Sequence, residues 1–347
     1  STRAARRDAP PGVAEEDATS GEPELAEVVA DEPLADPRVI PALRGLWGFD
    51  ALRPGQSAVI NRAMAGRDTL AVMPTGAGKS LTFQLPAMLL DGPTLVISPL
   101  IALMKDQVEA MPPAVRERTA VLNSSLAPDE QRRLLDGIAA GDYAMVYAAP
   151  ERLRQHAFVR ALRAGGVARV VVDEAHCISL WGHDFRPDYL SIPAVLPSLG
   201  EPPVLAITAT ATREMERGIA DRFGRDLELV RSSMFRPNLR YEVETVADRP
   251  AKIDRIVALC REEPGSGIVY VSSRRDAETI ADLLRRARVQ AVAYHAGMDP
   301  GTRSRNQDAF MSGRTRIVVA TVAFGMGVDK ADVRLIVHAA PPGSLEA

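Results

Sequence analysis

A glycine-rich segment between a predicted strand and a predicted helix is the most informative chemical feature of this sequence. Residues 73–80 read Met-Pro-Thr-Gly-Ala-Gly-Lys-Ser, after an apolar run typical of a buried strand and before a helical pattern. Glycines at such a turn let backbone N–H groups face an anion, while a lysine and a hydroxyl beside them can bind phosphate and Mg²⁺. The predicted phosphate-binding residues are Thr75, Gly76, Ala77, Gly78, Lys79 and Ser80, and Ser80 is also a predicted Mg²⁺ ligand.

A pair of carboxylates follows a second predicted strand further along the chain. Residues 167–172 are apolar and rich in valine, as in a central parallel strand, and Asp173 and Glu174 come directly after them. Ligands bind at the carboxyl ends of such strands. We predict that Asp173 binds Mg²⁺ and that Glu174 orients and deprotonates an attacking water, so that both join Lys79 as catalytic residues. Alone, the pair would be better explained as a solvated strand end, but the phosphate loop upstream favours catalysis.

At these residues the sequence resembles the RecQ-type DNA helicases of helicase superfamily 2, through most of residues 41–347. The strict phosphate-loop pattern has glycine where this chain has Met73, whereas the helicase variant keeps only the Thr-Gly-x-Gly-Lys-Ser/Thr core that is present here. Further segments match the family's motifs in their usual order, namely residues 53–56, 98–107, 206–211, 294–298 and 320–329.

The resemblance implies roles for residues in these segments. Those that would contact the nucleotide, in addition to the loop, are Gln56, which would read adenine, and Gly327 and Asp329, which would complete the cleft from a second domain. Those that would contact DNA or transmit the state of the nucleotide to the DNA side are Lys105, His176, Thr208 and Thr210. Two of the five histidines, His176 and His295, lie in the matching segments or next to the acidic pair, and both have the alternative explanation of ordinary hydrogen-bonded side chains.

The most family-specific segment is residues 177–189, directly after the acidic pair. Three of the sixteen aromatic residues of the chain fall within nine positions there, so aromatic side chains are concentrated in this segment. Bases stack on aromatic faces and arginine adds a cation–π or phosphate contact, so Trp181, Phe185 and Arg186 are predicted to sense single-stranded DNA. The segment resembles the RecQ aromatic-rich loop, which links strand binding to ATP hydrolysis. A loop held under the sheet by buried aromatic side chains is the structural alternative.

The composition and charge are compatible with a DNA-binding protein of about two domains. Of 347 residues, 46% are hydrophobic and 25% charged, which is an ordinary globular balance. Residues 1–40 carry four Arg against ten Asp and Glu, a net charge of −6, so the remainder carries +3 of the overall −3. A small positive surplus can be concentrated in one groove.

The first 38 residues are acidic, rich in Pro and Ala and without an aromatic residue, so we predict a disordered extension. No apolar stretch is long enough to cross a membrane and no signal peptide is present, which predicts a cytoplasmic protein. Cys177 and Cys260 cannot form a CxxC pair, and both are predicted to be buried packing groups, as in a reducing compartment. The four-cysteine zinc module of many RecQ proteins is absent from this sequence, so no zinc is expected.

Apolar runs alternate with helical patterns throughout the body of the chain, which is typical of α/β folds with mostly parallel sheets. Strands are predicted at 70–73, 94–98, 119–122, 144–147, 168–173 and 204–208, and then at 241–246, 268–272, 291–294, 316–320 and 335–338. By resemblance, these form two RecA-like P-loop domains at 39–232 and 233–347. The family's Gly-Arg-x-Gly-Arg motif does not occur here, so the second domain is expected to be incomplete at its C-terminus, in a fragment of a longer protein.

The sequence therefore predicts an ATP- and Mg²⁺-dependent DNA helicase that acts on single-stranded and forked DNA in recombination and repair, with 3′-to-5′ polarity by resemblance. Two alternatives stay open at this point. One is a nucleotide-dependent DNA-binding fragment with little turnover, because the trans-cleft arginines are missing. The other is an RNA-acting relative within superfamily 2, whose ATPase motifs are similar.

Overall fold

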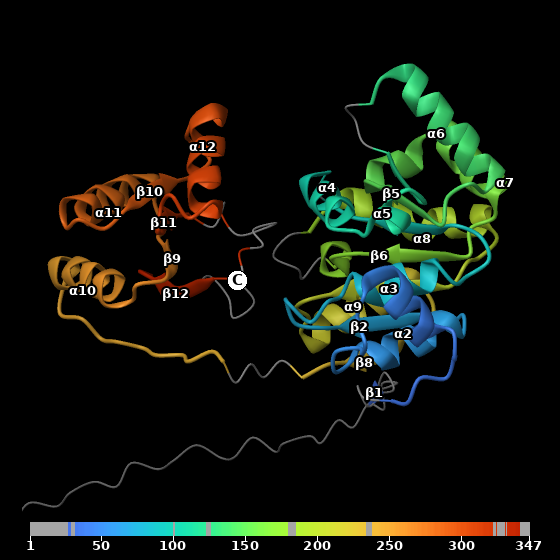
Figure 1. Ribbon diagram of the computed structural model, residues 1–347, viewed down its shortest axis with the longest axis horizontal. Helices are drawn as coiled ribbons and strands as arrows, with labels where there is room; N and C mark the ends of the chain where they lie inside the picture. The colour runs from blue at the N-terminus through green and yellow to red at the C-terminus, as the bar shows by residue number, and fades with distance from the viewer. Residues whose placement is uncertain are drawn as a thin grey trace, which may run out of the picture.

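The chain folds into two lobes, each built on one parallel β-sheet (Figure 1). The structure is a computed structural model that describes residues 27–28, 32–99, 101–122, 126–179, 185–233, 238–321, 324, 330 and 332–340. Parallel sheets with helices on their faces confirm the predicted α/β class. The residue at which the first domain ends, predicted at 232, stays a prediction; it falls in the connection between the two sheets.

The first sheet has eight strands in the order β1-β8-β2-β7-β6-β3-β5-β4. They are β1 (Glu27–Val28), β2 (Thr69–Val72), β3 (Thr94–Ile97), β4 (Thr119–Leu122), β5 (Met145–Ala148), β6 (Arg169–Val172), β7 (Val204–Thr208) and β8 (Glu228–Arg231). Because β2, β7 and β6 are neighbours and run in the same direction, the segments that follow them meet at one edge of the sheet.

Two apolar cores cover the two faces of this sheet, and successive residues of a strand alternate between them. Leu70 and Val72 of β2 belong to one core, while Ala71 and Met73 belong to the other. The helical elements of the lobe are α1 (Val39–Ala42), η1 (Leu43–Trp47), α2 (Gln56–Met64), α3 (Leu81–Ala87), α4 (Ile101–Glu109), α5 (Pro113–Arg116), α6 (Pro128–Ala140), η2 (Pro150–Arg154), α7 (His156–Gly165), η3 (Ala175–Ile178), η4 (Pro187–Leu190), α8 (Ser191–Val195), η5 (Leu196–Leu199) and α9 (Arg213–Phe223).

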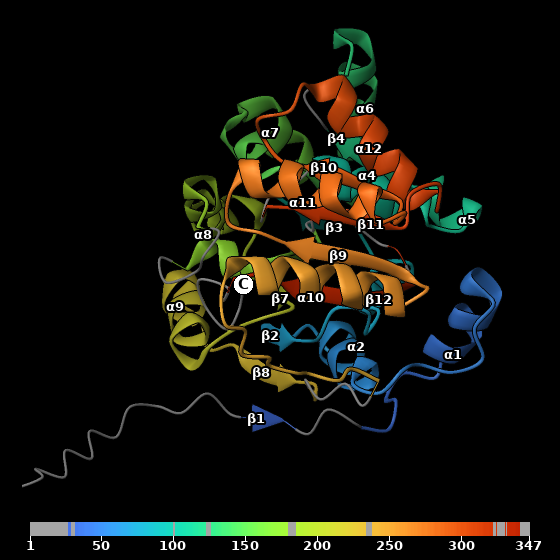
Figure 2. The same ribbon diagram turned by 90° about the vertical axis from the view of Figure 1, so that its left-hand side faces the viewer.

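The second sheet has four strands in the order β10-β11-β9-β12. Its strands are β9 (Ser266–Tyr270), β10 (Ala291–Tyr294), β11 (Ile317–Ala320) and β12 (Val333–His338), and its helices are α10 (Arg249–Glu262), α11 (Arg274–Arg286) and α12 (Pro300–Met311). Helices α10 and α11 lie across one face (Figure 2) and contribute Ile256 and Ile280 to the core there. Phe310 of α12 packs on the opposite face.

All six strands predicted for the first sheet are present within one residue at either end, and β8 was not predicted. The strand predicted at 241–246 is wrong. That segment has no ladder in the structure, and Tyr241 and Val243 are 86% and 99% exposed. Alternating apolar residues form a strand only where a neighbouring strand pairs with the backbone, and none of the described strands pairs with residues 241–246.

The N-terminal extension was predicted to reach residue 38, but its last part packs on the first lobe. Residues 27–28 pair with β8, and the Glu32 carboxylate forms two hydrogen bonds with the Arg62 guanidinium, at 2.9 and 3.0 Å. Leu34 packs against the small core that contains Val39. The predicted boundary therefore lies too far along the chain, and residues 1–26 and 29–31 lie outside the described residues.

Candidate nucleotide site

The glycine-rich loop lies at the carboxyl end of β2 and leads into α3. Gly76 and Gly78 have φ values of 82° and 77°, in the left-handed region that a residue with a Cβ adopts only with strain. The loop closes through hydrogen bonds from the Ala77 N–H to the Pro74 carbonyl and from the Leu81 N–H to the Gly78 carbonyl. Lys79 and Ser80 follow the turn and are partly exposed. The backbone therefore has the curled form that the sequence predicted for phosphate binding.

Two side chains from the segment before α2 hold this loop. Arg53 donates from Nη1 to the Gly76 carbonyl at 2.7 Å. Gln56 is 1% exposed, and its Nε2 donates to the carbonyls of Ala77 at 3.1 Å and Gly78 at 3.0 Å. A Cβ added to Gly78 would come within 2.5 Å of that Nε2 atom, so Gln56 also requires glycine at this position.

The Gln56 amide is engaged by protein backbone at both ends, because its Oε1 accepts from the Arg53 N–H at 2.8 Å. In the structure Gln56 therefore fixes the loop, and its predicted contact with adenine stays a prediction. Sequence reasoning gave Arg53 no role of its own. Its position three residues before Gln56, in the same motif, could have indicated a role at the loop.

Asp173 is buried at the end of β6, 3% exposed, beside the loop. Its Oδ1 accepts from the Glu174 N–H at 3.0 Å, and its Oδ2 accepts from Gln107 Nε2 at 3.1 Å. Burial, followed by the negative charge of Glu174, raises the pKa of Asp173, while the Gln107 hydrogen bond and the positive charge of Lys79 act in the opposite direction. The fold thus brings Lys79 close enough to interact electrostatically with Asp173.

Glu174 turns the chain sharply away from β6. It has φ 49° and ψ 49°, a left-handed conformation that costs a non-glycine residue about 1–3 kcal/mol and is found most often at functional sites. The turn buries Asp173 but leaves the Glu174 side chain 27% exposed, with its Oε2 3.4 Å from His176 Nδ1. The two adjacent carboxylates consequently face different surroundings, as separate roles require.

The ends of β6 and β7 are joined by a hydrogen bond between His176 and Thr208. His176 Nδ1 lies 2.9 Å from Thr208 Oγ1, which donates to the Thr210 carbonyl at 3.0 Å. Because the hydroxyl proton is directed to Thr210, we assign the proton of the shorter contact to His176 Nδ1. Three residues predicted to transmit the state of the nucleotide therefore lie in one chain of hydrogen bonds, in which His176 and Thr208 are buried.

Residues 180–184 of the aromatic segment, and with them Trp181, lie outside the described residues. Arg186 is partly buried and donates from Nη1 to the Pro99 carbonyl at 2.9 Å. Tyr189, which sequence reasoning did not single out, is fully buried and its hydroxyl donates to the Asp173 carbonyl at 2.9 Å. The end of the segment is thus attached both to the acidic strand and to the segment between β3 and α4.

The remaining predicted residues have no described contact with the loop or with Asp173. Lys105 on α4 is exposed and forms an ion pair with Glu109 at 3.6 Å. Gly327 and Asp329 lie outside the described residues. His295 in the second lobe is buried, with its Nε2 3.1 Å from Glu278 Oε1, which fits the ordinary hydrogen-bonded alternative.

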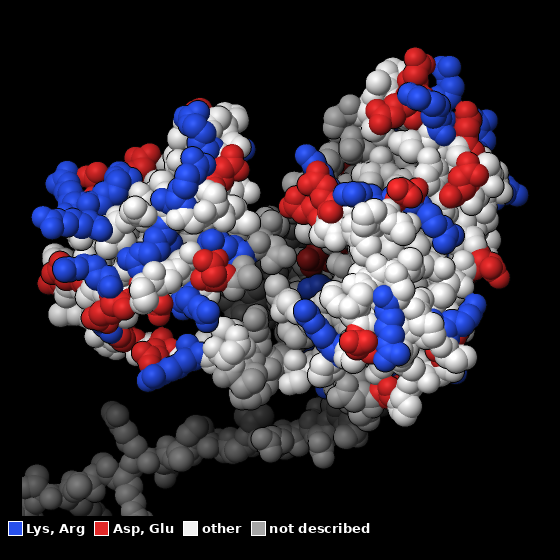
Figure 3. Space-filling view, viewed as in Figure 1, with Lys and Arg blue, Asp and Glu red and all other residues white. Residues whose placement is uncertain are grey.

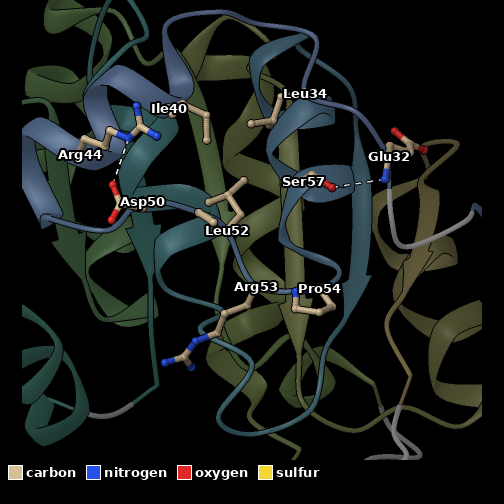
Figure 4. Close-up of a pocket in the computed structure, with 10 residues that line it drawn as sticks. Glu32, Leu34, Ile40, Arg44, Asp50, Leu52, Arg53, Pro54 and Ser57 are labelled. Atoms are coloured by element: carbon tan, nitrogen blue, oxygen red, sulfur yellow. Dashed lines mark hydrogen bonds and ion pairs between the residues drawn. The ribbon is translucent and has the colours of Figure 1, made fainter.

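A hollow of about 550 Å³ lies next to this site, between residues 32–34, η1 and the segment before α2 (Figure 4). Leu34, Ile40 and Leu52 form its apolar part, and the Arg44–Asp50 ion pair at 3.2 Å closes one side. Arg53 lines its rim but turns its guanidinium away from the other lining residues, toward the loop. The hollow is therefore separate from the phosphate side of the site.

Charged side chains of both signs are interspersed on the face shown in Figure 3. Helices α11 and α12 carry a group of basic side chains, namely Arg274, Arg275, Arg285, Arg286, Arg303 and Arg305. Within the described residues, no three His, Cys, Asp or Glu side chains are grouped as metal ligands, and no helix is long and apolar enough to cross a membrane. Cys177 and Cys260 are both fully buried, as predicted.

Comparison with known proteins gives two family matches. The DEAD/DEAH box helicase family matches residues 53–217, and the helicase conserved C-terminal domain matches residues 249–347. The chain is 40% identical over 312 residues to the ATP-dependent DNA helicase RecQ of Haemophilus influenzae, which covers 90% of this chain and 50% of that protein. It is also 40% identical over 307 residues to the probable ATP-dependent DNA helicase RecS of Bacillus subtilis, which covers 87% of this chain and 61% of that protein.

A solved structure supports the fold in particular. The helicase Lhr of Mycobacterium smegmatis, bound to single-stranded DNA and AMP-PNP, superposes with a TM-score of 0.64 at 23% identity over 87% of this chain and 44% of that chain. This likeness concerns the fold alone. The chain spans 50–61% of the length of the two relatives named above.

Proposed function

Because the chain belongs to the RecQ family of superfamily 2 helicases and contains its helicase core, we propose that it is a DNA-stimulated ATPase that translocates on single-stranded DNA and separates duplexes. We assign it 3′-to-5′ polarity, forked DNA as substrate, and a role in DNA recombination and repair in the cytoplasm. The RecQ names of the relatives support DNA as the substrate.

The residues of the site fit Mg-ATP. The curled loop and Lys79 would hold the phosphates, and Ser80 and Asp173 would hold Mg²⁺, which neutralises developing charge on the phosphates when it is bound. Magnesium is usually held by one or two carboxylates together with substrate phosphates, so a dedicated cage of acidic side chains is not required. The partly exposed Glu174 would orient the attacking water and accept its proton.

The observation that carries this proposal is that the loop with Lys79 and the buried Asp173, which are far apart in sequence, follow strands β2 and β6 at the same end of one parallel sheet. The register of β2, β7 and β6 brings them to one edge of the sheet. The His176–Thr208 hydrogen bond then joins the acidic strand end to β7. Closure of the second domain on nucleotide would alter this connection and with it the grip on DNA.

The test is steady-state phosphate release by this chain with saturating single-stranded DNA, with single-stranded RNA and with neither. We expect stimulation by DNA well above that by RNA, and strand separation of a duplex with a 3′ tail but not of one with a 5′ tail. Equal stimulation by RNA would favour an RNA-acting enzyme. Nucleotide-dependent DNA binding with phosphate release at background would favour a binding module and contradict the proposal.

A further inference from the structure

A neutral side chain from outside the acidic motif reaches the proposed metal ligand. Gln107 lies near the end of α4, and its Nε2 donates to Asp173 Oδ2 at 3.1 Å across 66 residues of sequence. The fold makes this contact possible because α4 follows β3, and β3 pairs with β6 so that Ile97 lies opposite Val172. Gln107 therefore reaches the carboxyl end of the strand that precedes Asp173.

Asp173 is held on several sides by these contacts. Its N–H donates to the Ile97 carbonyl, its carbonyl accepts from Tyr189, and one carboxylate oxygen accepts from the Glu174 N–H. These three contacts involve its backbone or Oδ1, whereas Gln107 engages Oδ2. A rotation of the carboxylate would break the Gln107 contact, so this amide restricts the orientation of the group.

The orientation of the Gln107 amide is itself determined. An ionised carboxylate only accepts hydrogen bonds, so the amide nitrogen must face Asp173 and the amide oxygen must point elsewhere. That oxygen, Oε1, is buried and has no hydrogen-bond partner among the described residues. A buried amide oxygen without a partner is unfavourable, and an ion-bound water at this position would satisfy it.

We propose that Gln107 is a positioning residue for magnesium: its amide nitrogen fixes the Asp173 carboxylate in the orientation that binds the ion, and its amide oxygen accepts a hydrogen bond from an ion-bound water. This inference rests on the proposed function, since it assigns Asp173 to Mg²⁺. Magnesium keeps several of its waters when bound to proteins, and partners outside the first coordination shell orient its ligands.

The test measures binding without turnover. The fluorescent nucleotide mant-ADP is titrated into the 347-residue chain over a range of Mg²⁺ concentrations, and the Mg²⁺ concentration that gives half of the gain in affinity is determined. Gln107→Met keeps the length of the side chain and removes both polar atoms. We expect it to raise that Mg²⁺ concentration about 10–100-fold, the usual effect of losing such a partner, with affinity in the absence of Mg²⁺ unchanged.

A matched control is Gln131→Met on α6, which makes the same chemical change on a partly exposed side chain at the β4 side of the sheet and should leave the Mg²⁺ dependence unchanged. Gln107→Asn is a second variant that keeps the polarity but is too short to span the present contact. It should show the same shift in Mg²⁺ dependence, and it takes the place of Gln107→Met in the test if that variant folds poorly.

Two results would overturn the inference. One is an unchanged Mg²⁺ dependence in both folded variants. The other is an equal loss of affinity with and without Mg²⁺, accompanied by a lower melting temperature, because it would make Gln107 a packing residue. The proposed function fails separately, if the parent chain binds mant-ADP with no dependence on Mg²⁺ or not at all.

Discussion

The two sheets of this protein differ in what they bury at their edges. Several buried polar side chains at the carboxyl end of the first sheet have hydrogen-bond partners there. Gln56 donates to the glycine-rich loop, Asp173 accepts from Gln107, and His176 is bonded to Thr208. The second sheet has mainly apolar cores, and its strand β12 exposes Ile336 to 55%. Polar groups can be buried only with partners, so the first sheet holds a pre-arranged site.

This difference predicts which substitutions will change nucleotide binding or hydrolysis and which will change neither function nor stability. Changes at the first sheet's edge should alter nucleotide or DNA responses without unfolding the lobe. Changes in the exposed segment before α10 should do neither.

Lys79→Ala should lower ATP hydrolysis by about 10²-fold or more, because it removes a charge that stabilises the transferred phosphoryl group. Lys79 is partly exposed and follows the loop, so the melting temperature should stay at the parent's value. Lys252→Ala on α10 makes the same change in the second lobe and should keep the parent's turnover. Retention of most turnover by Lys79→Ala would show that the loop is not the phosphate site.

Trp181→Ala should lower the DNA-stimulated ATPase rate much more than the basal rate, since a lost base-stacking contact is worth about 1–3 kcal/mol and acts on the strand alone. Both rates and the melting temperature should be measured together. A parallel fall in all three would instead identify Trp181 as a packing residue and favour the structural alternative for the aromatic segment.

The binding of Mg-nucleotide should weaken as the pH falls below neutral. Burial and the charge of Glu174 raise the pKa of Asp173, so this carboxyl keeps its proton to a higher pH than an ordinary aspartate. Magnesium binds the ionised form, and affinity is therefore lost as the pH approaches the raised pKa from above. Titrations of mant-ADP with and without Mg²⁺ across this range check the effect. A gain in affinity on adding Mg²⁺ that stays constant across this pH range would contradict the prediction. Asp173→Asn should remove that gain at every pH.

Val243→Ala should change the free energy of unfolding by less than about 0.5 kcal/mol, because this side chain is 99% exposed. Val171→Ala in β6 is the comparison, and it should cost about 2 kcal/mol or more by leaving a cavity in a fully buried position. Denaturant unfolding of both variants measures the two values. A comparable loss in Val243→Ala would mean that residues 241–246 pack against the protein in solution.

The correct and the incorrect strand predictions have different physical reasons. The strands of the first sheet were predictable because valine-rich runs between turn residues have few other stable placements. Residues 241–246 have a similar local pattern but no partner strand in the structure, and strand pairing is a property of distant segments. Strand β8 was missed for the converse reason: residues 228–231 are half charged, and pairing with both β1 and β2 makes them a strand.

Three features were predictable without the structure: the turn at Gly76 and Gly78, the acidic pair after a buried strand, and the order of the family's motifs. These depend on backbone preferences and on neighbours a few residues apart. Three contacts were not predictable from the sequence: Gln56 with the loop, Gln107 with the Asp173 carboxylate, and Tyr189 with the Asp173 carbonyl. Such contacts join groups 16–66 residues apart, and their geometry follows from strand order and register.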